Sequence, residues 1–532
     1  MNKKEIDSKA PKSPKPLRWA SLIYIVVVSA LGGLLFGFDS GVISGCEKGM
    51  QREYFPVIAQ KADQLEAIKV ELNEAIEAND TAQISQIQER QKAEEEKKYE
   101  GEDRANFLHG FTVSVALIGT LIGAFGVGRP SDRFGRKKTL FVMALLYLIS
   151  AVGCAFPPNW ETLVLMRFLG GIAIGGSSVV VPLYIVEIAP GHVRGRLVAM
   201  NQLNIVLGIL VSYISNYYVA LAIDNHTVVW SWCESLAGLF ASGMSADAIK
   251  WRLMFGVEAF PAFLFFLLLF SIPESPRWLM RFGRRDEARK VLESIGGTDP
   301  EETLDDIAQS LANASHGENV PLFQRKYLWP IFLAWSVAMF NQLSGINAIN
   351  YYAPRIFEMF RFESQAALAS TIGLGAINLT FTILAFLFID KLGRRALLMF
   401  GALGTCAMHL LAAWQISLGS NANPWIAIPA ILGFIAFFAV SQGAVIWVFI
   451  AEIFPNAVRA KGQALGSFTH WFMCTIISWI FPFVVGLSET SGSYVFVFFA
   501  AMTLLQFFFA WKLMPETKGG ELESLEKKIL NA

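Results

Sequence analysis

The sequence is poor in charge, and the charge that it has is balanced. Only 17% of its 532 residues are charged, and 44 basic side chains face 44 acidic ones. Without a basic excess, the chain offers no surface of the kind that attracts nucleic acid. Because 54% of the residues are hydrophobic, the shortage of charge also argues against a water-soluble protein.

Residues that bind metals or carry redox chemistry are also scarce. The five cysteines form no C-x-x-C motif, and the six histidines have no ligand spacing, so we expect no metal site and no cofactor. Cys46 and Cys233 fall in predicted loops on one side of the membrane, where they either pair or remain free thiols. The glycine-bearing stretch 128–138 lacks the spacing of a phosphate-binding loop, and no nucleophile–base set is visible. The sequence therefore predicts neither an ATP-driven pump nor an enzyme.

What the chain has in abundance is long apolar runs. Its mean hydropathy is +0.44, and windows of about twenty apolar residues recur along it. Twelve such windows lie near 20–45, 107–127, 139–157, 161–186, 197–222, 252–272, 328–354, 367–389, 396–418, 425–451, 463–485 and 493–514. The pattern predicts an all-α membrane protein with twelve transmembrane helices, and we expect it to function as a monomer.

The connections between these windows alternate in charge. Every second loop is rich in Lys and Arg, which predicts that both termini are cytoplasmic. We expect the protein to lie in the plasma membrane, which in a bacterium is the inner membrane. The predicted order is a tail over 1–19, a six-helix bundle over 20–272, cytoplasmic linker helices over 273–327, a second bundle over 328–514 and a tail over 515–532. Residues 46–105 interrupt the first bundle as a charged, extracytoplasmic helical insertion.

An internal repeat relates the two bundles. Glu187-Ile188-Ala189-Pro190 with Arg194 recurs as Glu452-Ile453-Phe454-Pro455 with Arg459, and Asp132-Arg133-Phe134-Gly135-Arg136 recurs as Asp390-Lys391-Leu392-Gly393-Arg394. Pro-Glu pairs at 273–274 and 515–516 follow each bundle. Three pairs in the same order indicate duplication, with a ligand site expected between two pseudo-symmetric halves.

Asp39, Arg167 and Glu258 are ionisable residues that lie inside predicted spans. Asp39 follows a glycine-rich apolar stretch, Arg167 lies in the apolar run 163–176, and Glu258 lies in the sixth window. A charge at membrane depth is costly and marks a functional site with a partner. The alternative is a static ion pair that only fixes helix packing.

The ordered set of motifs resembles the sugar porter family of the major facilitator superfamily. The resemblance covers nearly the whole chain outside 46–105. Its motifs are Gly128 with 132–137, Arg167 with Gly171 and Gly175, the run 182–187 (PLYIVE), the run 273–278 (PESPRW), the run 342–347 (QLSGIN) with Tyr351 and Tyr352, and the run 515–519 (PETKG).

The resemblance implies a mechanism as well as a fold. In proton-coupled members, an aspartate at the place of Asp39 takes the proton, close to residues that match Arg167 and Glu258. The positions of Gln202, Gln342, Asn347 and Trp447 line the sugar site of the family.

Amide and aromatic side chains suit a sugar, because amides both donate and accept hydrogen bonds and rings cover its apolar face. The predicted binding residues are Phe36, Gln202, Asn341, Gln342, Asn347, Tyr351, Asn378, Gln442, Trp447, His470 and Trp471. The sequence departs from the family at Asn341, where a glutamine is common, at Ala444, where a proline is usual, and at His470, where an amide is frequent.

Further charges lie in the basic loops. We expect Asp132, Arg133, Arg136, Glu187, Arg194, Glu274, Arg277, Asp390, Arg394, Glu452 and Arg459 to form inter-helix ion pairs that hold a cytoplasmic gate closed. The predicted function is symport of a monosaccharide, a pentose or hexose, with a proton by alternating access. The alternatives are a facilitative uniporter of the same fold and a sugar receptor without flux.

Overall fold

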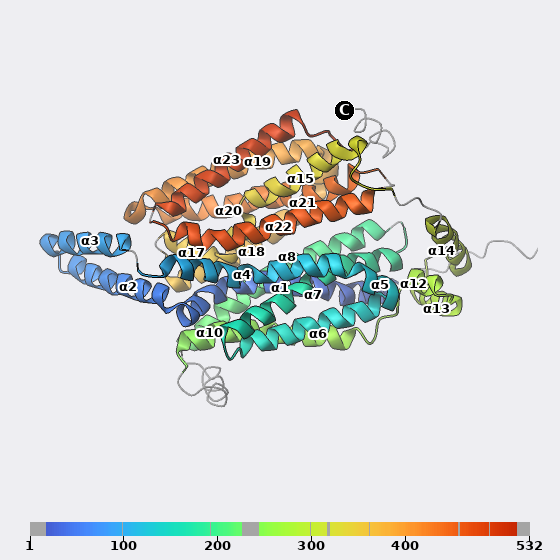
Figure 1. The fold of residues 1–532 in the computed structure, drawn as a ribbon, viewed down its shortest axis with the longest axis horizontal. Helices are drawn as coiled ribbons and strands as arrows, with labels where there is room; N and C mark the ends of the chain where they lie inside the picture. Colours follow the sequence, from blue (N-terminus) through green and yellow to red (C-terminus); the bar gives the residue numbers. More distant parts are fainter. Residues whose placement is uncertain are drawn as a thin grey trace, which may run out of the picture.

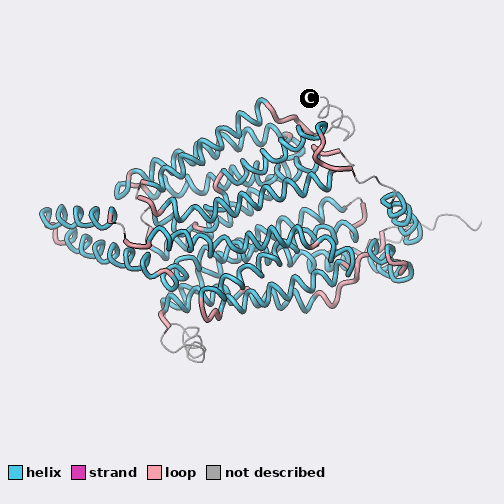
Figure 2. Tube along the Cα trace, in the orientation of Figure 1, coloured by secondary structure: helices cyan, strands magenta, loops and turns pink. Residues whose placement is uncertain are grey.

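Long helices lying roughly side by side make up most of the molecule (Figure 1). The computed structural model describes residues 17–97, 99–191, 193–225, 244–297, 299–315, 320–360, 362–455, 458–488 and 490–518. These residues contain helices, turns and short loops, without a strand (Figure 2). The all-α fold expected from the apolar windows is confirmed.

The helices form two groups that lie against each other, the first in blue to green and the second in yellow to red (Figure 1). The first half holds α1 (Trp19–Tyr54), α4 (Glu102–Gly126), α5 (Gly128–Phe134), α6 (Arg136–Ala155), α7 (Trp160–Ile188), α8 (Arg194–Asp224), α10 (Ala246–Val257) and α11 (Ala259–Leu268). The second half holds η2 (Arg325–Tyr327), α15 (Leu328–Leu343), α16 (Ile346–Tyr351), α17 (Ala353–Met359), α18 (Ser364–Leu392), α19 (Arg394–Ser417), η3 (Gly419–Asn421), α20 (Pro424–Val440), α21 (Gln442–Glu452), α22 (Arg459–Val485) and α23 (Ser491–Lys512).

The remaining helices lie at opposite ends of this body. Helices α2 (Pro56–Glu77) and α3 (Thr81–Glu96) project from one end, which we name the hairpin end. Helices α12 (Pro276–Arg281), α13 (Arg285–Ile295) and α14 (Pro300–Ser315) lie at the other, the linker end (Figure 1).

Eleven helical stretches among the described residues are long and apolar enough to cross a membrane. The one predicted span that is missing from these eleven is the seventh, 328–354. It is also helical, but it breaks at Ser344 and Gly345 into α15 and α16. Neither piece is long enough to span alone. Two further spans are interrupted, at Glu258 between α10 and α11 and at Ser441 between α20 and α21. Interrupted membrane helices free backbone groups, which is tolerated where they line a cavity or are buried in protein.

The hairpin turns where the sequence suggests, at Asn79 and Asp80. Asn79 adopts a φ of 57°, and the Asp80 side chain caps α3 by accepting from the backbone N–H groups of Ala82 and Gln83. Helix α1, however, continues nine residues beyond the predicted end of the first span, to Tyr54. Residue 46 therefore lies within α1 rather than in a loop, and Cys46 is a buried residue whose thiol donates to the Trp251 carbonyl. Cys233 lies outside the described residues.

Glycines spaced four apart on α1 bring it into close contact with α8. Gly33, Gly37, Gly41 and Gly45 share one face of α1, and a Cβ atom at each would collide with α8. At Gly37 the collision is with the backbone carbonyl of Ile205, which no side-chain movement can relieve. Small residues of this kind let membrane helices approach backbone to backbone.

This contact generates a stability prediction. Gly37→Ala should force α1 away from α8 and lower the apparent melting temperature in detergent by several degrees, since overpacking costs about 1–3 kcal/mol. Gly373→Ala is the matched control, because Gly373 is helical and a Cβ there meets nothing within 4 Å. The control should melt at or above the wild-type temperature, and equal melting of the two variants would contradict the prediction.

Candidate functional site

A buried ion pair joins α1 and α7 inside the first half. Arg167 Nη1 lies 2.6 Å from Asp39 Oδ1, and the two side chains are only 2% and 5% exposed. The guanidinium carbon also lies 5.3 Å from the centre of the Phe255 ring. The structure thus brings together the two charges that the sequence predicts to be partners, at a place where both side chains are almost completely buried.

Glu258 supplies a second carboxylate to this region. It is 3% exposed, sits at the turn between α10 and α11, and interacts electrostatically with both Asp39 and Arg167. Arg167 Nε has no hydrogen-bond partner among the described residues. One guanidinium therefore faces two carboxylates, and it has a free donor with which to change partners.

Amide side chains cluster at the break of the seventh span. Gln342 Nε2 donates to Asn341 Oδ1 at 3.0 Å, and Asn347 Nδ2 donates to Gln342 Oε1 at 2.7 Å across the break. His470 on α22 lies within 3.2 Å of Gln342 Nε2. The cluster therefore spans α15, α16 and α22, in the second half.

Gln442 extends the cluster at the interruption of the tenth span. Asn341 Nδ2 lies 3.4 Å from the backbone carbonyl of Gln442. The Gln442 side chain is 1% exposed, and neither its amide oxygen nor its amide nitrogen has a partner among the described residues. An unpaired buried amide is costly, so a polar ligand that satisfied it would bind favourably.

Aromatic rings connect the amide cluster to the first half. The Trp447 and His470 rings are 4.9 Å apart, and those of His470 and Trp471 are 5.0 Å apart. Trp471 in turn contacts Phe36 of α1 with a centroid distance of 5.6 Å. Phe36 lies one helical turn from Asp39, so the rings lead from the amides to the buried ion pair.

Three other predicted sugar-binding residues lie apart from the hydrogen bonds of the amide cluster. Tyr351 is buried on α16 and interacts electrostatically with Arg167. Asn378 accepts a 3.4 Å hydrogen bond from Thr382 within α18. Gln202 is partly buried on α8, and its side chain forms no hydrogen bond with the described residues. The structure therefore does not bring Gln202 or Asn378 into the amide network.

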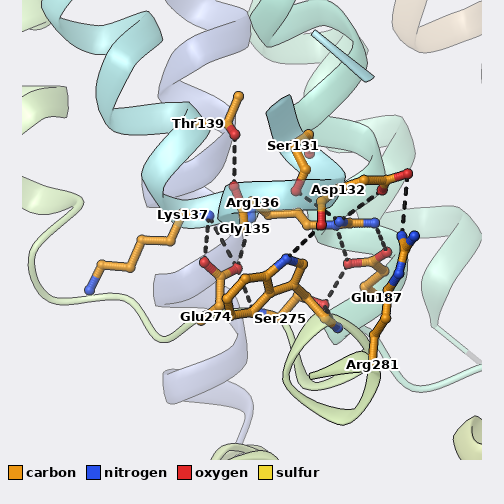
Figure 3. Close-up of polar contacts among 11 residues, drawn as sticks. Ser131, Asp132, Gly135, Arg136, Lys137, Thr139, Glu187, Glu274, Ser275 and Arg281 are labelled. Carbon is orange, nitrogen blue, oxygen red and sulfur yellow. Dashed lines mark hydrogen bonds and ion pairs between the residues drawn. The ribbon is translucent and has the colours of Figure 1, made fainter. Parts of the chain in front are cut away.

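At the linker end, a charge cluster surrounds Arg136 (Figure 3). Its guanidinium donates twice to Glu187, each time at 2.9 Å, and lies 3.1 Å from Asp132. Glu274 accepts the backbone N–H groups of Arg136 and Lys137 at 2.9 and 3.2 Å. Burial raises the pKa of the Glu274 carboxyl, against the opposing effect of these donors.

The second half repeats this cluster. Arg394 Nη2 donates to Glu452 at 2.9 Å, and Glu516 accepts the backbone N–H groups of Arg394 and Arg395 at 2.9 and 3.1 Å. Gly135 and Gly393 precede the two arginines with φ values of 105° and 90°. A side chain at either glycine would collide with the carboxylate of Glu274 or Glu516. The sequence repeat is thus also a repeat of atomic contacts.

The other predicted gate charges make local contacts. Arg194 and Arg459 donate to the carbonyls five residues earlier, at 3.5 and 3.2 Å. Arg277 donates to Ser310 of α14, and Arg133 lies over the Phe134 ring. The Asp390 side chain lies outside the described part of the structure. The ion pairs found here join helices within one half, rather than one half to the other.

Charged contacts between the halves lie at the hairpin end instead. Lys48 of α1 forms an ion pair with Glu358 of α17, and the neighbouring Glu47 lies 3.9 Å from Arg355 of α17. Glu47 also pairs with His109 of α4 at 2.9 Å, with both side chains fully buried. We call these five residues the seam.

Sequence reasoning missed the seam. Glu47 and Lys48 lay beyond the predicted end of the first span, and Arg355 lay just beyond the seventh. His109, however, falls inside an apolar window, and an ionisable residue there was a usable signal.

Comparison with known proteins gives this geometry a context. A family model described as "Sugar (and other) transporter" matches residues 25–528. The D-xylose-proton symporter of Escherichia coli K12 is 34% identical over 530 residues, covering 94% of each chain. The arabinose-proton symporter of Bacillus subtilis is 32% identical over 513 residues, covering 95% of this chain and 94% of its own.

Solved structures agree with the sequence comparisons. The inward open conformation of the xylose transporter XylE from E. coli matches with a TM-score of 0.73 and 32% identity, over 95% of this chain and 99% of its own. The match extends across both halves. The chain therefore belongs to the sugar porter family of the major facilitator superfamily.

Proposed function

We propose that the protein carries a monosaccharide together with one proton, and that its two halves rock about a site between them. The observation that carries this proposal is the Asp39–Arg167 pair, buried within reach of an amide and aromatic cluster from the opposite half. The names of the xylose and arabinose relatives point to a pentose. We further propose that both termini are cytoplasmic and that the hairpin end faces outward.

The charge of the ion-pair region supports a single coupling proton. Asp39 and Glu258 together carry two negative charges when ionised, against one positive charge on Arg167. Adding one proton makes the region neutral, and a neutral region costs less to enclose in a membrane. Protonated Asp39 would release Arg167, whose unpartnered Nε can then donate to Glu258. The exchange of partners gives the proton a way to alter the packing of α1 and α7.

The proton gradient is large enough for this work. One proton entering down 100 mV releases about 2.3 kcal/mol, and each unit of pH difference adds about 1.4 kcal/mol. Since about 1.4 kcal/mol corresponds to a tenfold ratio, both terms together can sustain a sugar gradient of some hundreds-fold.

The sugar would lie against the amide cluster. Gln442 offers an unpaired donor and acceptor, and Gln342 and Asn347 form bonds to each other that sugar hydroxyls can replace. Trp447 and Trp471 supply flat apolar walls for the ring face of a sugar. Phe36 and Trp471 come from different halves, so the position of the halves determines the shape of this wall.

The seam supports an arrangement closed at the hairpin end. Lys48–Glu358 and Glu47–Arg355 hold α1 against α17, while the clusters at the linker end act within each half. Opening toward the hairpin end must separate both pairs. This is consistent with the resemblance to a structure described as inward open.

The central experiment is uptake into proteoliposomes from a panel of labelled sugars, with and without an imposed proton gradient. We expect accumulation of a pentose or hexose only when the gradient is present. Equal, non-accumulating uptake in both conditions would instead identify a uniporter.

Asp39→Asn should abolish accumulation, because the amide cannot take up the proton, and bring the internal-to-external sugar ratio from tens-fold to about one. Exchange of sugar across a membrane without a gradient should persist. Asp63→Asn is the matched control, since this aspartate is 66% exposed on α2, and its accumulation should equal that of the wild type. Uphill uptake by the Asp39 variant would refute the assignment.

Gln442→Leu should raise the KM for sugar more than tenfold, because it removes an amide that would bind sugar hydroxyls. It should cost little stability, because the amide forms no hydrogen bond to the described residues that the substitution would break. Gln506→Leu is the matched control. Gln506 is equally buried and equally unpartnered, but it lies on α23, which packs against α19 and α15 within one half. A similar KM for both variants would show that Gln442 does not touch the sugar.

Lys48→Glu should weaken the seam by placing like charges opposite each other, and the double variant Lys48→Glu with Glu358→Lys should restore it. Pulsed electron resonance between spin labels at Glu161 and Ala366, in a chain freed of its native cysteines, measures the opening of the hairpin end. The single variant should lengthen this distance and the double variant should reverse the change. If the seam does not affect the opening of the hairpin end, the distance between the labels will be the same in the wild type, the single variant and the double variant.

A further inference from the structure

The break in the seventh span exposes a backbone carbonyl inside the protein. Helix α15 ends at Leu343 and α16 begins at Ile346, with Gly345 at a φ of 81° between them. Ser344 sits at the C-terminus of α15, where carbonyls leave the helical hydrogen-bond ladder. In the interior of a membrane protein such a carbonyl needs a partner from elsewhere, because no bulk water can supply one.

His409 of α19 supplies that partner. Its Nε2 lies 3.0 Å from the Ser344 carbonyl oxygen, and the side chain is fully buried. Because a carbonyl only accepts, Nε2 must carry the proton. The imidazole lies 4.4 Å from the Phe434 ring and 5.7 Å from those of Phe496 and Phe499. Three aromatic rings therefore hold the donor in place.

One of these rings also shapes the break itself. A Cβ on Gly345 would collide with Phe499, so the glycine and the ring are in close contact. Ser344 Oγ also donates to the Asn341 carbonyl at 2.6 Å, so a second backbone carbonyl near the end of α15 has a hydrogen-bond donor. His409, Phe499 and the Ser344–Gly345 break form one packed unit, which we name the clamp.

The geometry of the amide cluster depends on the break. Gln342 and Asn347 are five residues apart, and in a continuous helix such residues point about 140° away from each other. Helical neighbours that face each other are three or four residues apart. The 2.7 Å bond between Asn347 and Gln342 therefore forms only because the helix is interrupted between them.

We propose that His409 is a positioning residue for sugar binding: by donating to the Ser344 carbonyl it holds the break that aligns Gln342 with Asn347. His409 does not itself contact the sugar. The inference rests on the proposed function, because it assigns a purpose to the same amide cluster. It adds that the affinity for sugar is controlled from α19, outside the amide cluster itself.

The test compares variants that keep or remove the donor. His409→Gln keeps an N–H at a position close to Nε2, whereas His409→Met fills similar space without a donor. His409→Asn has a donor that is too short to reach, so it serves as a second loss variant if the methionine variant folds poorly. Equilibrium binding of labelled xylose and arabinose to the purified protein is the first measurement, with apparent melting temperature recorded alongside.

We expect the methionine and asparagine variants to weaken sugar binding about tenfold or more, while the glutamine variant stays within about threefold of wild type. The pH dependence of uptake should not change, because the proton site is elsewhere. Wild-type affinity in the methionine and asparagine variants, or equal loss in the glutamine variant, would overturn the proposal.

Hydrogen–deuterium exchange over residues 341–352 separates this proposal from the proposed function. Faster exchange in the methionine variant than in the glutamine variant is expected whether or not xylose or arabinose binds. If the wild type binds neither sugar, the assignment of substrate fails while the clamp is still tested by exchange. Unchanged exchange in both loss variants would overturn the clamp directly.

Discussion

The attraction between one carboxylate and one guanidinium, kept away from water, is the constraint on which the rest of the structure depends. Asp39 and Arg167 come from α1 and α7, and their contact of 2.6 Å ties these two helices together. Around the pair, the glycines of α1 let it lie close to α8, and Gly171 and Gly175 of α7 lie against backbone carbonyls of α4. The same close packing excludes water from the pair, which makes the charge state of Asp39 matter for the packing around it.

Duplication gives the two halves the same set of contacts at the linker end. In each half an arginine that follows a positive-φ glycine binds a glutamate of the neighbouring helix, and a second glutamate accepts backbone N–H groups beside it. Ser275 and Thr517 then donate to Glu187 and Glu452 in matching positions. These contacts tie helices together at the linker end of each half, whereas the ion pairs that join one half to the other lie at the hairpin end.

Much of the fold and part of the site could be predicted from the sequence. Apolar windows locate the spans because the thickness of the bilayer sets the length of a membrane-spanning helix. Asp39 and Arg167 stand out because charge inside such windows is rare. The break at Ser344 and Gly345 could not be predicted in this way, because hydropathy averages over it and the partners that stabilise it, His409 and Phe499, are distant in sequence. The contact between α1 and α17 escaped for a similar reason, since it depends on how the halves dock. Gln202 and Asn378 are the opposite case: the sequence suggests them as binding residues, but in the structure their amides do not join the cluster.

Helix α1 runs unbroken from Trp19 to Tyr54, a length of 36 residues or about 54 Å. Asp39 lies near its middle, between the Phe36 ring on one side and the seam on the other. A rigid rod that tilts about its centre moves most at its tips and least at its midpoint. A tilt of about 10° would shift each tip by roughly 4–5 Å for arms of about 23–30 Å, while the carboxylate would stay almost where it is. In the proposed symport, the proton would therefore bind at a nearly stationary point of α1, while the two ends of the same helix would move as the halves rock.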